Sequence, residues 1–293
     1  MKIDSKFVNT SIKDYSYKVH WRKIMNYAAA VNDDNPYYFN DEKEEGIVAP
    51  PMYIVAITWP IIENLKDFIQ IEKFPIKVLK TIVHYTEHIK IHRLIKPNDE
   101  LFLKGKIVAI LPHRAGTHIV VRLDANDKNN NPVFTEHIGG MLRGVKLDGD
   151  GLGEDTLPYI PVFSNATKPI WKKTIEIDKL RSFIYDGCTD IIFAIHTSKK
   201  FAHLVGLPGI ILQGTATLAY AVKEIINTEG GGNPHKIKEI YCKFTGMVKP
   251  GTIIQLQLNN KSKLKENTEL YFDVYNNENK KAISSGFIVL NNY

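Results

Sequence analysis

Three residues in the second half of this chain have the types and the spacing of an acid/base site. Asp190 lies six positions before His196, and Gly214 follows 18 positions after the histidine, where an apolar stretch begins that predicts a long helix. A histidine can accept and return a proton near neutral pH without a large pKa shift. A glycine at a helix start can present its backbone N–H at the positive end of the helix dipole. The pattern predicts proton transfer on a substrate whose oxygen becomes negatively charged.

The residues next to these three complete the candidate site. We expect Tyr185, Thr189 and Gln213 to help bind the substrate and its charged oxygen, although packing is the stronger alternative for the tyrosine and the threonine. Asp186 competes with Asp190 as the acid that partners the histidine. Structural roles also fit the first three residues: a hydrogen-bonded loop histidine, an acid that caps a helix or turn, and a glycine required by close packing.

Other residue groups that could do chemistry have simpler explanations. His84, His88 and His92 recur every four residues, which on a helix would form a metal-binding face, but the isoleucines and valine among them favour a strand. The glycine run 230–232 follows a predicted helix and lacks the lysine of a phosphate-binding loop. Two cysteines are too few for a disulfide framework or a cysteine zinc site. We therefore expect neither a metal nor another cofactor.

Length and charge limit the class of protein. With 293 residues, of which 44% are hydrophobic and 24% charged, the chain can form about two globular domains. The net charge of +6 fits attraction of a polyphosphate as well as surface solubility, and the lysine pairs lie outside any nucleic-acid-binding motif. The apolar runs are too short or too interrupted to span a bilayer. We expect a cytoplasmic protein that binds neither nucleic acid nor membrane.

The elements that must position the site are repeated along the chain. Tyr27 lies 11 positions before Tyr38, and Tyr185 lies 11 positions before His196. In each half a short predicted helix is followed by an apolar helix and then by strands and a hairpin. The acidic, glycine-rich stretch 148–155 reads as a linker between the halves. Two unrelated α+β domains that share turn positions are the alternative.

This order predicts an α+β protein built as a tandem, or double, hotdog. Each domain would be an antiparallel sheet wrapped around one long apolar helix. Residues 1–150 would form the first domain and residues 151–293 the second. We place the chemistry in the second domain, because only that half has the candidate histidine, His196, and the candidate glycine, Gly214.

The segment 185–217 resembles the hydratase signature of the MaoC-like and R-specific enoyl-CoA hydratases. Counted from His196, the residues Ala202, Gly206, Gly214 and Thr217 fall where that signature has alanine, glycine, glycine and threonine. The first half resembles the same signature over 32–38, with a tyrosine in place of the histidine. Both halves are thus similar to the family, as in its double-hotdog members, where one half keeps the catalytic pair.

The chain also departs from that signature. The family aspartate lies five positions before the histidine, where this chain has Ile191, so Asp190 aligns only with one inserted residue. Gln213 replaces the histidine of the family His-Gly pair, while the backbone role of the glycine can persist. A subset of the family has a tyrosine 11 positions before the histidine and a threonine seven before it, as Tyr185 and Thr189 are here.

The resemblance implies a hydro-lyase that adds or removes water across the 2,3-bond of an acyl-CoA thioester, with Asp190 and His196 as the catalytic pair and possible homodimerisation. A hotdog acyl-CoA thioesterase and a non-catalytic acyl-thioester-binding protein are the alternatives. The first half would have lost chemistry, because a tyrosine with an ordinary pKa near 10 is a poor base at neutral pH. Its apolar helix would then line an acyl tunnel or form ordinary core, through Met52, Tyr53, Ile57 and Trp59.

Overall fold

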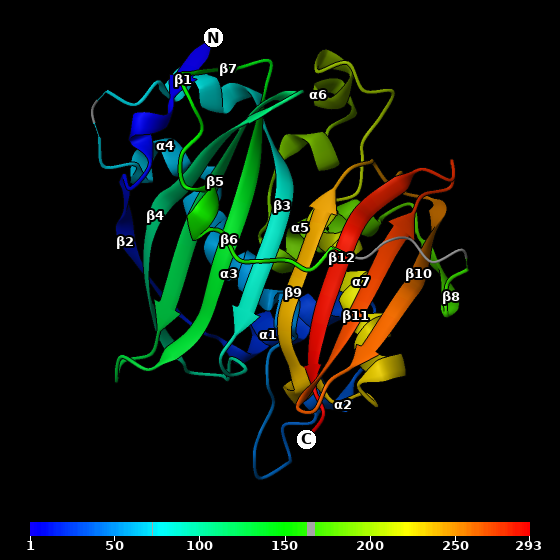
Figure 1. Ribbon diagram of the computed structural model, residues 1–293. Helices are drawn as coiled ribbons and strands as arrows, with labels where there is room; N and C mark the ends of the chain where they lie inside the picture. Colours follow the sequence, from blue (N-terminus) through cyan, green and yellow to red (C-terminus); the bar gives the residue numbers. More distant parts are fainter. Residues whose placement is uncertain (72, 163–167) are drawn as a thin grey trace.

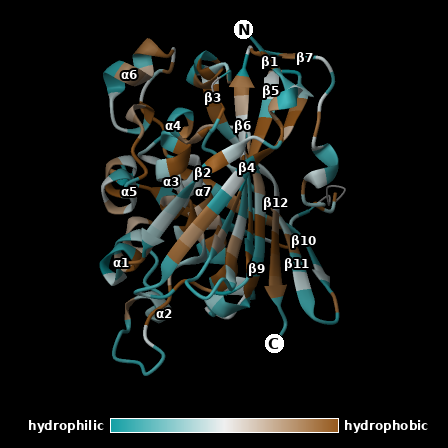
Figure 2. Cartoon of the chain, turned by 90° about the vertical axis from the view of Figure 1, so that its left-hand side faces the viewer, coloured by the Kyte–Doolittle hydropathy of each residue, from teal (hydrophilic) through white to brown (hydrophobic). Residues whose placement is uncertain are grey.

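The computed structural model describes residues 1–71, 73–162 and 168–293. Its main feature is one antiparallel sheet of ten strands, in the order β2-β4-β5-β6-β3-β9-β12-β11-β10-β8. The helices lie on one side of this sheet, as Figures 1 and 2 show from two directions. The buried apolar side chains of both halves form one continuous core between these two layers.

The two halves supply five strands each to the sheet. Before residue 150 the elements are β1 (Lys2–Asp4), η1 (Ser5–Phe7), β2 (Ser11–Lys18), α1 (Trp21–Ala30), α2 (Pro36–Phe39), η2 (Pro51–Tyr53), α3 (Ile54–Glu63), α4 (Leu65–Phe68), η3 (Ile76–Thr81), β3 (Ile82–Ile91), β4 (Glu100–His113), β5 (Gly116–Asn126), β6 (Pro132–Arg143) and β7 (Lys146–Asp148). After it they are η4 (Glu154–Thr156), β8 (Trp171–Ile177), α5 (Arg181–Thr189), η5 (Ala194–His196), α6 (Lys199–Leu204), α7 (Gly214–Glu229), η6 (Pro234–Lys236), β9 (Ile237–Phe244), β10 (Thr252–Lys263), β11 (Asn267–Tyr275) and β12 (Lys281–Asn291).

The halves join where β3 pairs with β9. Glu87 lies opposite Cys242 in this antiparallel register. On the helical side α1 packs against α5, so the two halves also meet there. The repeated plan and the tandem hotdog fold are confirmed, and so is the strand across His84 and His88, which lies within β3.

The central helix differs between the halves. In the C-terminal half it is α7, a helix of 16 residues that begins at Gly214, as the sequence predicted. In the N-terminal half it is α3, which has only 10 residues and contains Pro60. A proline inside a helix lacks the N–H that would bond to the preceding turn, which weakens the helix there. The two cores are therefore wrapped around helices of unequal length.

The predicted linker is partly structured. Its first residue, Asp148, ends β7, and Leu152 forms an isolated bridge with Ile110 of β4. Leu157 packs against a small apolar cluster that includes Val108 and Val120, on the side of the sheet away from the main core. The linker thus contacts β4, and the domain boundary near residue 150 stays a prediction.

The core of the N-terminal half contains two carboxyl groups. Glu87 and Glu136 are fully buried on neighbouring strands, β3 and β6. Thr58 Oγ1 of α3 donates to Glu136 Oε1 at 3.2 Å, and His84 Nε2 lies 3.1 Å from Glu87 Oε2. Burial raises the pKa of Glu87 to about 8, and it raises the pKa of Glu136 well above its ordinary value. Burial therefore favours the protonated form of both acids.

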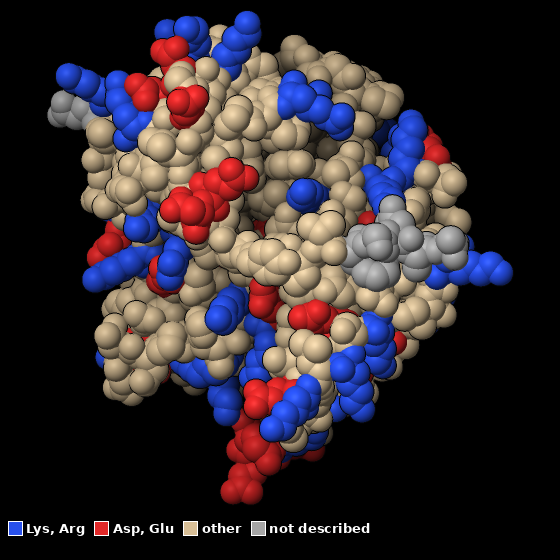
Figure 3. Space-filling model, viewed as in Figure 1, with Lys and Arg blue, Asp and Glu red and all other residues tan. Residues whose placement is uncertain are grey.

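Charged side chains of both signs are interspersed over the face of the molecule seen in Figure 3. Within the described ranges, every helix is too short or too polar to cross a lipid bilayer.

Candidate active site

Matching backbone hydrogen bonds align the entry to the central helix in the two halves. In the N-terminal half Val48 N donates to Tyr37 O at 3.0 Å. In the C-terminal half Ile211 N donates to Ile195 O at 3.5 Å. The residue after each acceptor is Tyr38 in one half and His196 in the other, which the sequence had already equated.

A second pair of bonds fixes the residues that follow. Ala49 N donates to Ile95 O, and Leu212 N donates to Val248 O, both at 2.8 Å. Counting onward from this alignment gives the counterparts of the C-terminal site residues. Gln213 corresponds to Pro50, Gly214 to Pro51 and Thr215 to Met52.

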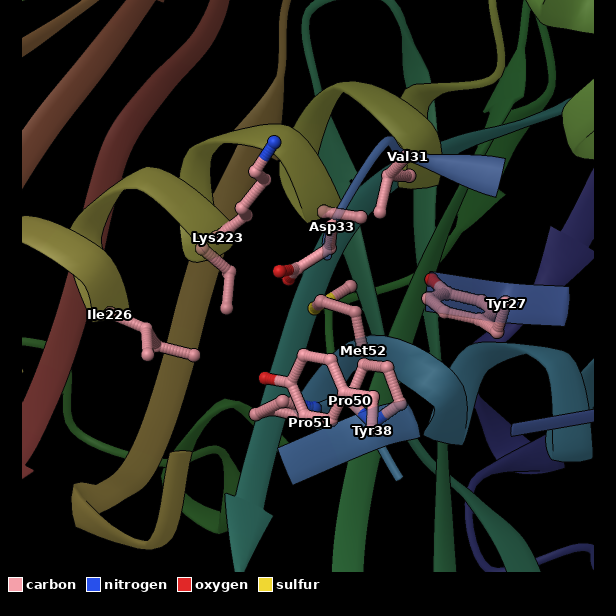
Figure 4. A pocket seen from close by; sticks show the side chains of 11 residues that line it. Tyr27, Val31, Asp33, Tyr38, Pro50, Pro51, Met52, Lys223 and Ile226 are labelled. Atoms are coloured by element: carbon pink, nitrogen blue, oxygen red, sulfur yellow. The ribbon is translucent and has the colours of Figure 1, made fainter. Parts of the chain in front are cut away.

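A small void of about 10 Å³ lies between the N-terminal half and α7 at the aligned position. Asp33 points its carboxylate into it, and Lys223 of α7 lies on the opposite wall (Figure 4). The lining includes five residues whose C-terminal counterparts are Tyr185, His196, Gln213, Gly214 and Thr215: Tyr27, Tyr38, Pro50, Pro51 and Met52. Four of the six site residues that the sequence predicted in the C-terminal half therefore have counterparts that line this void.

His196 is held as a neutral imidazole. It ends the turn η5, and its Nδ1 lies 2.9 Å from the carbonyl oxygen of Ile211. A carbonyl oxygen only accepts, so Nδ1 carries the hydrogen and Nε2 keeps a free lone pair. Burial lowers the pKa of His196 to about 4, and the bond to Ile211 opposes this shift. The side chain is a proton acceptor ready at neutral pH.

Ser182 connects the histidine to the start of α7, a role that sequence reasoning missed. Its Oγ donates to the Ile211 oxygen at 3.2 Å, the same oxygen that receives His196. Its own carbonyl accepts a hydrogen bond from Gln213 Nε2 at 3.1 Å. The predicted Gln213 thus fixes the position of the helix start, while its Oε1 is buried without a partner in the described structure. A serine on α5 gave no signal in the sequence that could have identified it.

Gly214 is the first residue of α7, where backbone N–H groups have no partner within the helix. A Cβ placed on it would lie 3.1 Å from Cδ1 of Phe244 on β9, which is tighter than ordinary packing. The contact supports the close-packing explanation for this glycine. The anion-binding explanation stays a prediction, based on the unpaired N–H groups of a helix start.

Tyr185 and Thr189 are fully or almost fully buried on α5. The Tyr185 hydroxyl donates to Thr215 Oγ1 at 3.1 Å, so it contacts the first turn of α7. Thr189 Oγ1 donates to the Tyr185 carbonyl at 2.6 Å and accepts from Ile191 N at 3.2 Å. Thr189 therefore caps the end of α5, and the tyrosine is the one that reaches the site.

Asp190 ends α5 in the left-handed conformation, with φ of 58°. Aspartate tolerates this conformation better than most residues do. Its carboxylate forms an ion pair with Lys23 of α1, and its side chain is 61% exposed. The separation of 158 positions that relates Tyr27 to Tyr185 makes Asn32 its counterpart, and Asn32 is also left-handed, with φ of 52°.

The same separation relates Lys23 to Arg181, whose guanidinium donates to Asn32 Oδ1 at 2.9 Å. The contact of Lys23 with Asp190 and the contact of Arg181 with Asn32 are thus related by symmetry, and each acts as a clamp that joins α1 to α5.

Among the described residues no hydrogen bond or ion pair joins Asp190 to His196, and none joins Asp186 to His196. Asp186 has one buried oxygen without a partner, and burial raises its pKa, with a further contribution from the charge of Asp190. The structure brings together His196, Gly214, Gln213 and Tyr185, and it leaves Asp190 at the junction of the halves.

Comparison with known families matches each half separately. Residues 165–281 match the family described as MaoC like domain, and residues 6–136 match the family described as FAS1-like, dehydratase domain region. A protein of Dictyostelium discoideum named probable enoyl-CoA hydratase 2 is 20% identical over 99% of this chain and 97% of its own length.

Solved structures share the whole fold. A MaoC-like dehydratase from Phytophthora capsici superposes with a TM-score of 0.82 at 20% identity, covering 97% of both chains. A Mycobacterium tuberculosis protein described as having a double hotdog fold superposes with a TM-score of 0.61 at 10% identity, covering 97% of this chain and 96% of its own. These likenesses establish the double hotdog fold.

Proposed function

We infer that this chain, which carries a FAS1-like dehydratase region followed by a MaoC-like domain, is a hydro-lyase that adds or removes water across the 2,3-bond of an acyl-CoA thioester. The Dictyostelium relative named for enoyl-CoA hydration supports this reaction. The observation that carries the proposal is the Ile211 carbonyl. This carbonyl accepts the Nδ1 hydrogen of His196 and lies three residues before Gly214, so the base and the start of α7 belong to one hydrogen-bonded unit.

In the hydration direction the groups act as follows. His196 Nε2 takes a proton from water as the water oxygen bonds to C3 of the enoyl thioester. The π pair of the 2,3-bond forms a double bond between C1 and C2 as the carbonyl π pair moves to the thioester oxygen, where the N–H groups at the start of α7 stabilise the charge. The protonated histidine then donates this proton to C2. Water is thereby added without a net change in the protonation of the enzyme.

The test is turnover of 2-enoyl-CoA substrates. The purified protein would be mixed with crotonyl-CoA and with longer and branched 2-enoyl-CoAs, and loss of the conjugated-thioester absorbance would be followed. We expect turnover in the parent and its collapse in His196→Ala. Release of free thiol would instead establish the thioesterase alternative, and binding without either reaction would establish a carrier of acyl thioesters.

Asp190 is the proposed partner of His196, and its contact with Lys23 offers a second role as a clamp. Two variants separate these roles. Asp190→Asn removes the charge, whereas Lys23→Met breaks the same ion pair and keeps the carboxylate. A partner in catalysis predicts that only Asp190→Asn loses turnover. A clamp predicts that both variants turn over like the parent, with similarly small losses of stability.

We further propose that the protein works in the cytoplasm, where a monomer is sufficient and a homodimer is possible. Cys188 and Cys242 are both free thiols, as expected in a reducing compartment. Fluorescent tagging in cells would test the location. Sedimentation of the purified protein would test the oligomeric state.

A further inference from the structure

A directed chain of hydrogen bonds runs from the N-terminal half to the start of α7. The hydroxyl of Tyr27 on α1 lies 3.0 Å from the hydroxyl of Tyr185 on α5. Tyr185 in turn donates to Thr215 Oγ1 at 3.1 Å. A phenol has one hydrogen, so Tyr27 must donate to Tyr185. All three residues are buried, and the donation from Tyr185 to Thr215 directs the chain toward the threonine.

The chain leaves the Thr215 hydroxyl with a hydrogen to donate. A buried helical threonine ordinarily donates to the carbonyl four residues back, as Thr217 does to Gln213 at 3.3 Å. For Thr215 that carbonyl belongs to Ile211. The Ile211 oxygen already accepts from His196 Nδ1 and from Ser182 Oγ, which takes both of its lone pairs.

No acceptor for the Thr215 hydrogen is found in the part of the chain that the structure describes. A buried hydroxyl without an acceptor costs free energy unless a ligand supplies one. The position of Thr215 indicates which ligand would do so. Thr215 directly follows Gly214, and its counterpart Met52 lines the void of the other half. A thioester whose oxygen receives the N–H groups at this helix start would lie beside the Thr215 hydroxyl.

We propose that Thr215 Oγ1 donates a hydrogen bond to the thioester carbonyl oxygen of the substrate, next to the backbone N–H of Gly214, and that Tyr27 and Tyr185 are positioning residues that keep this hydroxyl a donor. The proposal rests on the proposed hydro-lyase function. It makes the N-terminal half a contributor to the site, since Tyr27 lies in that half. Burial raises the pKa of both phenols, so they stay protonated donors at neutral pH.

Kinetics of matched variants test the donor. Thr215→Val removes the hydroxyl and keeps the shape, and kcat should fall by about 10²-fold with KM little changed, as for loss of one oxyanion donor. Thr215→Ser restores the hydroxyl and should recover kcat to within about 3-fold of the parent. Tyr185→Phe removes the donor that fixes the direction and should give an intermediate loss. The control is Thr117→Val, because the buried Thr117 hydroxyl donates to the Val145 carbonyl at 2.9 Å on the far side of the N-terminal half.

A second measurement does not depend on turnover. The C=O stretching frequency of bound butanoyl-CoA, a saturated thioester, reports how many donors its oxygen receives. It should lie below the free value in the parent and in Thr117→Val, and move back toward the free value in Thr215→Val.

The outcomes separate the two proposals. A parent that hydrates crotonyl-CoA, with Thr215→Val equal to it in kcat and in carbonyl frequency, would overturn the donor and leave the function standing. A parent that shifts the bound carbonyl through Thr215 but turns over no 2-enoyl-CoA would overturn the function and keep the donor. Loss of kcat in Thr215→Val that Thr215→Ser does not recover would also count against the donor.

Discussion

The two halves share a backbone path at the entry to the central helix and differ in the side chains that they place there. The bond from Val48 N to Tyr37 O and the bond from Ile211 N to Ile195 O hold the same entry to the central helix. Within that frame the C-terminal half has a histidine and a glycine where the N-terminal half has Tyr38 and a proline. Proline has no N–H to offer an anion, and a buried tyrosine is no base at neutral pH.

The acid is distributed in the opposite way. Asp33 lies five positions before Tyr38, where the family signature has its aspartate, and it points into the void of the N-terminal half. Burial raises its pKa to about 6. The corresponding position of the C-terminal half, five before His196, is Ile191. Each half therefore carries a part of the family signature that the other lacks.

The sharpest way to break this comparison is to remove the side chain that differs most. His196→Ala should lower kcat/KM for a 2-enoyl-CoA by about 10²- to 10⁴-fold, as loss of a general base does. The matched change in the other half, Tyr38→Phe, should leave kcat/KM within about 2-fold of the parent, since a phenol there transfers no proton. Steady-state kinetics of both variants, with thermal melting to confirm folding, checks this. Equal losses in both would show that the halves act as one site.

A second variant removes one backbone N–H from the C-terminal half, as in the N-terminal half, which has a proline at that position. Gly214→Pro gives the C-terminal half the residue found at position 51 and deletes the N–H at the start of α7. Proline is tolerated at the first position of a helix, so we expect the fold to persist and kcat to fall by about 10²-fold. Gly214→Ala is the control. It keeps the N–H and adds only the contact with Phe244 at 3.1 Å, so most of the activity should remain. If alanine cost as much as proline, close packing alone would explain the glycine.

The pH dependence of activity should come from the C-terminal half. With the pKa of His196 lowered to about 4, the base stays neutral well below the ordinary histidine value of 6.5. The acid limb of kcat/KM should therefore lie near pH 4 to 5 instead of near 6.5. Rates measured between pH 4 and 8 check this, with a pH jump to separate reversible titration from unfolding. An acid limb at 6.5 would mean that the histidine is solvated in the free enzyme.

One buried acid of the N-terminal half should contribute to the pH dependence of stability with a definite sign. Glu87 has a pKa of about 8 in the folded chain against 4.5 as its ordinary value. Between these values the folded state holds a proton on Glu87 that the unfolded state has lost, so the contribution of Glu87 to the free energy of unfolding falls as the pH rises. Glu87→Gln should flatten that decline by more than about 1 kcal/mol between pH 5 and 8. Chemical denaturation at several pH values measures it, and an unchanged slope would assign the decline to other groups.

Much of this architecture could be predicted because it rests on local patterns. Periodicity placed β3 across His84 and His88, and it placed the start of α7 at Gly214. The shared spacing of 11 residues equated Tyr38 with His196, which the backbone hydrogen bonds confirm. Aligning Asp190 with the family aspartate requires one inserted residue in the C-terminal half. The structure shows no such insertion, because Asp190 corresponds to Asn32, and both residues have the left-handed conformation. The sequence alignment differs from the structure because a spacing counted from His196 cannot show where the preceding helix, α5, ends.

The sequence by itself determined the order of elements, the repeat, and the histidine and glycine that differ between the halves, since each of these depends on neighbours a few positions away. Only the tertiary structure decided how they are used. The bond between Tyr27 and Tyr185 joins residues 158 positions apart, and the single carbonyl of Ile211 sets the tautomer of a histidine 15 positions before it. Such contacts depend on how α1, α5 and α7 pack in space, and packing between distant segments leaves no periodic trace in the chain.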